Sequence, residues 1–167
     1  ISSGGAVSLA AITSGTLAIT GTGITLNGNV TTTGTQTYTG AVTLGASVTL
    51  TGTGITTSST VAASNYSLTL VTDALALGAA VNGGTGTLTI KPKTATTTIG
   101  LGTGASSGTL NLNNTELGYI NTASNNFASL VIGDATNGTG AITYNTNSTN
   151  ISFGSNLTLQ QKSTGDG

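Results

Sequence analysis

The chain contains no cysteine, histidine, methionine or tryptophan. Without cysteine there is no disulfide and no thiol nucleophile, and without histidine there is no imidazole base. The usual side-chain ligands of zinc, copper and iron are missing for the same reason. We therefore expect no cofactor and no metal site, and a fold held together without covalent cross-links.

Charged side chains are also scarce. They make up 4% of the 167 residues, against about 25% in an ordinary soluble domain, and the formal net charge is -1. Such a charge provides no electrostatic attraction for nucleic acid or for an anionic membrane, and no apolar run approaches the roughly 18 residues of a membrane span. We expect no nucleic-acid partner and no membrane span. The charged residues are Lys91, Lys93, Lys162, Asp73, Glu116, Asp134 and Asp166.

The length and the apolar content favour one folded unit. Disorder is a rival for a chain rich in Gly, Ser, Thr and Asn, but apolar residues make up 36% here and are regularly placed. The first twelve residues, ISSGGAVSLAAI, have neither an initiator methionine nor the basic start of a signal peptide. We expect residues 1–167 to be a single segment excerpted from a longer repeat protein.

Short apolar-x-apolar pairs organise the whole chain, and the stretch Tyr38 to Ile55 is typical of them. Strict alternation over three to five residues indicates a strand with one buried face, and no window has the spacing of a long amphipathic helix. The pairs are Val7/Leu9, Leu17/Ile19, Ile24/Leu26, Val42/Leu44, Val48/Leu50, Leu68/Leu70, Leu75/Leu77, Leu88/Ile90, Ile99/Leu101, Leu110/Leu112, Leu130/Ile132, Ile142/Tyr144, Ile151/Phe153 and Leu157/Leu159.

One series of these pairs recurs about every 20 residues, which is typical of a solenoid. The segments TLAITGTGIT and SVTLTGTGIT are close copies of each other. We predict that Leu70, Ile90, Leu112 and Ile132 stack in one inward column. The predicted structural core of the series consists of Val48, Leu50, Leu68, Leu70, Leu88, Ile90, Leu110, Leu112, Leu130, Ile132, Ile151 and Phe153.

A repeat of this length, filled by short strands and Gly/Asn turns, predicts an all-β fold, a parallel β-helix of roughly eight coils of about 20 residues. Each strand then pairs with its counterpart one coil on, at about 4.8 Å. Inward Leu, Ile and Val each contribute roughly 1.5–3 kcal/mol when fully buried. Outward Thr, Ser and Asn suit strand surfaces, and glycine suits the corners.

Two segments interrupt the pattern. Lys91-Pro92-Lys93 contains the only proline, which cannot donate to a strand ladder, so we place it at a corner or edge with both lysines in solvent. In the segment from Asn114 to Ser124, Leu117 and Ile120 break the period of two. We predict a single helical turn there, bulging from a corner, with Glu116 in its first turn.

Three segments resemble the motifs of active or binding sites. Gly104 to Gly108 matches a nucleophile elbow, but its serine has no histidine base, so we interpret it as a corner. Gly100 to Ala105 resembles a dinucleotide fingerprint that lacks the required helix. Gly83 to Thr87 begins the calcium-loop pattern of some β-helices, but Leu88 occupies the aspartate position.

A polysaccharide-active enzyme would need two carboxylates about 5–9 Å apart. Glu116 and Asp134 lie about one coil apart in sequence, but their offsets from the inward pairs differ. We therefore predict no catalysis and rank an enzyme third among the possible functions.

Two segments resemble the repeats of filamentous-haemagglutinin-like exoproteins, the adhesins of two-partner secretion, and of related autotransporter passengers. They are TGTQTYTGAVTLGASVTLTGTGI and TIGLGTGASSGTLNLNNTELGYINTASNNFASLVIGDATNGTGAITY, and the resemblance covers most of Gln36 to Tyr144. It implies a right-handed β-helix shaft, export across two bacterial membranes, and an extracellular or cell-surface location.

We thus expect a structural segment of an extracellular fibre or adhesin shaft that mediates or spaces adhesion to a host or neighbouring-cell glycan or protein. Ile1–Leu9 and Ile151–Leu159 carry no charge and no proline to block their strand edges, so we also expect self-association into filaments. The alternative is an ice- or glycan-binding module, because Thr-x-Thr recurs along the chain, although these repeats do not keep the register of the coil. Examples lie at Thr31/Thr33, Thr49/Thr51, Thr85/Thr87 and Thr94/Thr96.

Overall fold

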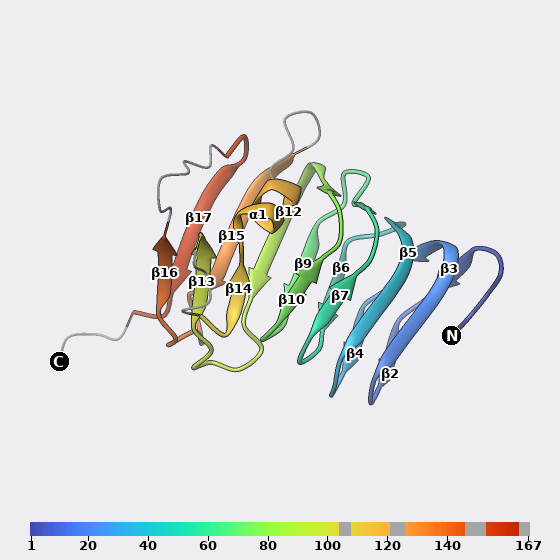
Figure 1. Ribbon diagram of the computed structural model, residues 1–167, viewed down its shortest axis with the longest axis horizontal. Coiled ribbons are helices and arrows are strands. Elements are labelled where there is room, and N and C mark those ends of the chain that lie inside the picture. The colour runs from blue at the N-terminus through green and yellow to red at the C-terminus, as the bar shows by residue number, and fades with distance from the viewer. Residues whose placement is uncertain (104–107, 121–125, 146–152, 164–167) are drawn as a thin grey trace.

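The computed structural model describes residues 1–103, 108–120, 126–145 and 153–163, and these residues form an all-β fold with one short helix (Figure 1). The helix is α1 (Asn114–Ile120). The strands are β1 (Val7–Leu9), β2 (Ile12–Ser14), β3 (Leu17–Leu26), β4 (Val30–Thr32), β5 (Gln36–Leu44), β6 (Val48–Thr51), β7 (Ile55–Thr57), β8 (Val61–Ala62), β9 (Leu68–Val71), β10 (Leu75–Leu77), β11 (Val81–Asn82), β12 (Gly84–Lys91), β13 (Ile99–Gly102), β14 (Leu110–Leu112), β15 (Phe127–Asp134), β16 (Ile142–Asn145) and β17 (Asn156–Gln161).

The strands form three parallel sheets. Sheet A has the order β1-β3-β5-β7-β10, with β8 and β11 paired beside it, and sheet B has the order β17-β15-β12-β9-β6-β4-β2. Sheet C is the smaller set β14-β13-β16. From β1 to β12 the chain passes back and forth between sheets A and B while it advances along the long axis (Figure 1).

The register of sheet B follows from the apolar pairs. Val48 pairs with Leu68 and Leu68 with Leu88, so both steps are 20 residues long. The side chains of these three residues are buried, whereas Thr49 and Thr69, the next residues along β6 and β9, are only partly buried. The alternation therefore separates a face toward sheet A from a face toward solvent, as expected for strands with one buried face. Every apolar pair whose two residues the structure describes lies within a strand.

The predicted column through Leu112 is wrong. Ile90 pairs directly with Ile132 in sheet B, whereas Leu112 pairs with Leu101 in sheet C. Between β12 and β15 the chain leaves sheet B to form β13, β14 and α1. The spacing of apolar pairs cannot reveal this detour, because an apolar pair fits the inward face of any sheet.

The end of the predicted series also differs. Leu130 pairs with Leu157 rather than with the pair at Ile151/Phe153. Ile151 lies outside the described residues, and Phe153 is a partly buried residue packed against the core.

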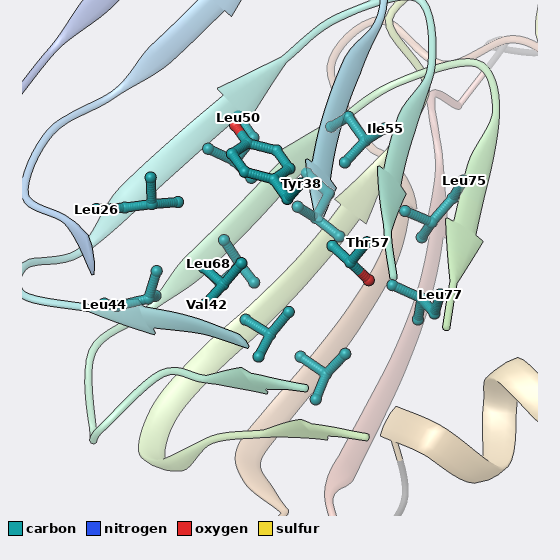
Figure 2. Close-up of a pocket in the computed structure, with 13 residues that line it drawn as sticks. Leu26, Tyr38, Val42, Leu44, Leu50, Ile55, Thr57, Leu68, Leu75 and Leu77 are labelled. Carbon is teal, nitrogen blue, oxygen red and sulfur yellow. The ribbon is translucent and has the colours of Figure 1, made fainter. Parts of the chain in front are cut away.

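The core lies between the sheets. Ten of the residues predicted for it are at most 4% exposed: Val48, Leu50, Leu68, Leu70, Leu88, Ile90, Leu110, Leu112, Leu130 and Ile132. Figure 2 shows how Tyr38, Leu50 and Ile55 meet in this interior.

One part of the core is polar. The hydroxyl of Tyr38 donates to Gln36 Oε1 at 2.8 Å, and Gln36 Nε2 donates to the carbonyl of Thr51 at 2.8 Å. A Cβ at Gly52 would lie 2.8 Å from Thr32 Oγ1 and 3.4 Å from the Gln36 side chain, so glycine leaves room for this network. Because the buried amide and phenol are hydrogen-bonded to each other and to the backbone, their desolvation is compensated.

Helix α1 closes the edge of sheet A. Asn113 Oδ1 accepts hydrogen bonds from the backbone N–H groups of Thr115 and Glu116, and Glu116 Oε2 accepts one from Asn113 N, which forms a capping box. Glu116 Oε1 also accepts a bond from Leu77 N on β10. Leu117 and Ile120 are buried, so the helix is packed into the core instead of bulging from a corner as predicted.

Candidate functional site

Four of the seven charged residues meet at one corner, where β9, β12 and β15 end. Asp73 follows β9, Lys91 ends β12, Lys93 comes after Pro92, and Asp134 ends β15. We call these residues the charged corner. Parallel strands in register place their ends side by side, which explains how residues far apart in sequence come together.

Asp73 joins the turn after β9 to the turn after β12. Its carboxylate accepts bonds from the backbone N–H groups of Lys93 at 3.0 Å and Thr94 at 2.8 Å, and from the hydroxyls of Thr94 at 2.7 Å and Thr97 at 2.8 Å. Burial raises the pKa of Asp73, but these hydrogen bonds outweigh it and hold the pKa below its ordinary value. The ionised carboxylate is thus a structural part of this turn.

Asp134 anchors the next turn. It accepts bonds from Thr136 N at 2.8 Å and Asn137 N at 3.1 Å, and it pairs with Lys91 Nζ at 3.3 Å. Burial raises the pKa of Asp134, while the two backbone bonds and the nearby Lys91 ammonium lower it, with a net decrease.

Both lysines depart from the prediction that they lie free in solvent. Lys91 forms the ion pair with Asp134, and Lys93 Nζ donates to the carbonyls of Thr32 and Thr33 at 3.2 Å. A partly exposed pair such as Lys91–Asp134 contributes about 0–1 kcal/mol. Because every charged group of the corner has a partner within the protein, the arrangement suits the fixing of turns better than the binding of a ligand.

The charged corner predicts an acid-sensitive stability. Since the pKa of Asp73 is lowered on folding, its contribution is present above the ordinary aspartate pKa of about 3.9 and is lost as the pH falls through the lower, folded value. We expect Asp73→Asn to be less stable than the wild type at pH 7, with the difference shrinking below about pH 4. Urea unfolding from pH 2 to pH 8 measures this.

The stability of the wild type above about pH 5 provides the control. Because the chain has no histidine, its stability should vary little between about pH 5 and pH 8. An Asp73→Asn variant that loses stability in acid as steeply as the wild type would contradict this role of Asp73.

An open groove lies beside α1. Its polar lining includes Thr103, Asn114, Glu116 and Tyr119. Both oxygens of Glu116 already accept backbone hydrogen bonds, from Leu77 and Asn113. Asp134, the other carboxylate considered for an enzyme, makes its contacts with Lys91 and with residues 136 and 137. The two carboxylates therefore share no hydrogen-bonding partner.

The interior between sheets A and B is too tightly filled for a ligand. The void lined by Tyr38, Leu50 and Thr57 measures about 10 Å³, hardly the space of one water molecule (Figure 2). Thr57 Oγ1 is buried there without a hydrogen-bond partner among the described residues. We interpret this region as packed core.

A second apolar hollow opens at the end of the molecule formed by β16 and β17. Its lining is Leu101, Tyr144, Phe153, Leu157 and Leu159. Tyr144 is 47% exposed although its partner on β13, Leu101, is buried. Leu157 and Leu159 are 38% and 44% exposed, although their partners on β15 are buried. Among the described residues, these inward-facing side chains at β16 and β17 are therefore only partly covered.

The remaining motifs provide no site among the described residues. Most of Gly104 to Gly108 lies outside those residues, as does the end of Gly100 to Ala105. In Gly83 to Thr87, the backbone N–H of Thr85 donates to Asn65 Oδ1 at 3.1 Å. No group of three or more acidic side chains that could hold a metal occurs in the described part of the chain.

Sequence reasoning missed the charged corner. The signal that could have revealed it is the distance of 20 residues between Asp73 and Lys93, one step of the strand register. Comparisons with family models, curated proteins and solved structures give no match to this chain. In the parts of the chain that the structure describes, no helix is long and apolar enough to cross a membrane.

Proposed function

We propose that the chain is a structural segment of an extracellular fibre or adhesin shaft, built as a right-handed parallel β-helix with about 20 residues per coil. The observation that carries this proposal is the repeated pairing of strands at steps of 20 residues, from Val48 to Leu68 to Leu88. A segment of this kind becomes longer along one axis as coils are added, which suits it to the role of a shaft.

Side-chain ladders between successive coils support the same function. Ser67 N donates to Ser47 Oγ at 3.0 Å and Thr87 N donates to Ser67 Oγ at 3.1 Å, each 20 residues away. Thr85 N bonds to Asn65 Oδ1 over the same distance in sequence. Such ladders hold neighbouring coils in register without disulfides or metals.

The chemistry of the described residues favours a structural over a catalytic role. Asp73, Glu116 and Asp134 are each held by hydrogen bonds to backbone N–H groups. Carboxylates committed to turns and caps are poor candidates for proton transfer to a substrate. On the resemblance to exported adhesins, we place the segment at a bacterial cell surface, where it spaces or mediates contact with a glycan or protein of another cell.

We further propose that the ends of the segment join to like coils, in a filament or in a longer shaft. At one end β16 and β17 are sheet edges, and Leu157 and Leu159 expose inward-facing side chains. At the other end β1 and β2 are the edges of sheets A and B. All strand pairs are parallel, so β2 of one copy can continue sheet B beyond β17 of another copy.

Small-angle scattering and electron microscopy of the isolated chain test this joint. We expect elongated assemblies in both low and high salt, because a contact made by apolar side chains and strand edges is little affected by screening. Changing Leu157 and Leu159 together to lysine should release monomers. Thr158→Lys, on the same strand but pointing outward, is the matched control and should leave the assemblies intact. A wild type that stays monomeric at high concentration in both salts would refute the joint.

A further inference from the structure

The outer face of sheet B carries threonines in two adjacent columns. Thr49, Thr69 and Thr89 pair with one another on β6, β9 and β12. In the neighbouring column Thr31 pairs with Thr51. We call these five residues the threonine array.

The array is regular in two directions. Neighbouring strands lie about 4.8 Å apart, and residues i and i+2 on one face of a strand lie about 6.7 Å apart. The pairing of Thr49, Thr69 and Thr89 has no register shift, so these residues follow the spacing between strands, and Thr49 and Thr51 follow the spacing along a strand. The array differs from the Thr-x-Thr repeats of the sequence, since only Thr49/Thr51 belongs to it as a pair. Its columns instead consist of single threonines 20 residues apart.

The hydroxyls of the array are free to bind something outside the protein. Threonines at the corners of the fold, such as Thr32, Thr72 and Thr97, donate their hydroxyls to carbonyls or to a carboxylate. The side chains of the five array threonines make no hydrogen bond within the described part of the protein, and all five are at least partly exposed. A β-branched side chain is also stiff at χ1, so the groups stay in place.

We propose that the threonine array binds ice. An ice crystal presents rows of water oxygens with repeats similar in size to those of the array, and each threonine hydroxyl can both donate and accept a hydrogen bond. The methyl groups between them bring apolar surface against the lattice. This inference goes beyond the proposed shaft function and does not depend on it.

The composition of this face selects ice over the other candidates. A glycan platform would present aromatic rings, and the outward positions of β4, β6, β9 and β12 hold none. A charged partner would need complementary charge, and both lysines near the array have partners within the protein: Lys91 pairs with Asp134, and Lys93 donates to the carbonyls of Thr32 and Thr33. A neutral surface of small side chains fits a neutral lattice best.

Ice-recrystallisation and thermal-hysteresis measurements on the full chain test the proposal. We expect the wild type to slow ice growth, and we expect Thr69→Tyr at the centre of the array to raise the required concentration at least about tenfold. Thr56→Tyr is the matched control, because Thr56 points outward on β7 of sheet A, and it should act like the wild type. Circular dichroism and the melting temperature establish that each variant is folded.

Two results would overturn the proposal. One is a folded wild type with no more effect on ice than an equal mass of an unrelated protein. The other is equal activity in Thr69→Tyr and Thr56→Tyr. If Thr69→Tyr does not fold, Thr49→Lys replaces it, since Thr49 lies in the same column on β6. Full activity in folded Thr49→Lys would refute the array in the same way.

Discussion

Ile90→Asp is expected to lower the stability of the protein strongly at neutral pH. Ile90 is fully buried in β12 and lies between Leu70 on β9 and Ile132 on β15. An unpaired carboxylate at this position costs at least about 4 kcal/mol, whereas the whole stability of a domain is about 5–15 kcal/mol. Protonation of the introduced carboxylate removes part of this cost, so the loss of stability should become smaller as the pH falls. Urea unfolding followed by circular dichroism at pH 7 and pH 4 measures both effects.

Thr89→Asp is the matched control for this experiment. Thr89 precedes Ile90 on the same strand but faces solvent, so the same new side chain stays hydrated. The cost should stay within about 1 kcal/mol, the range of strand propensities. Equal losses in the two variants would mean that the inward and outward faces of β12 are wrongly assigned.

Gly40→Ala is expected to destabilise the protein by at least about 3 kcal/mol. Gly40 has a φ of 134°, a conformation that side-chain-bearing residues rarely adopt. A Cβ there would also lie 2.1 Å from the carbonyl oxygen of Gly21, which belongs to the paired strand β3. The register of β3 and β5 shifts between Thr20 and Gly23, so this glycine lies where both strands bend. A thermal or urea melt of the variant measures the loss.

Gly23→Ala tests the same substitution on the facing strand β3, where Gly23 pairs with Ala41, the residue after Gly40. No atom lies within 4 Å of a Cβ built at Gly23, and its φ is not in the left-handed region. We expect a change of no more than about 1 kcal/mol, and a gain is possible because alanine restricts the unfolded chain. If Gly40→Ala were tolerated as well as Gly23→Ala, the close approach of β3 and β5 would be refuted.

The sequence was informative where the signal is local. The pairs Val48/Leu50 and Leu68/Leu70 predicted strands with one inward face, and both lie in such strands. The break of period at Leu117 predicted the helix, because Asn113 and Glu116 can cap a first turn from within the same short segment. Each of these features depends only on residues within about one turn or one strand of each other.

The candidate sites were less predictable, because they depend on contacts between distant segments. The charged corner forms only when the turns after β9, β12 and β15 meet, and Lys91 and Asp134 are 43 residues apart. The threonine array was missed for the same reason. Thr69 belongs to no Thr-x-Thr repeat, and its neighbours Thr49 and Thr89 are each 20 residues away.

The sequence by itself determined the all-β class and, for the strands that carry an apolar pair, their positions and inward faces, because the period of two is a property of the strand backbone. Strands without such a pair, such as β4 and β7, were not predicted. Only the tertiary structure decided which strands are neighbours. Leu112 beside Leu101, and not between Ile90 and Ile132, is the clearest case. The hydrophobic effect is non-directional, so one buried apolar pair can stack on any other. The choice between them depends on how the intervening turns and α1 direct the chain.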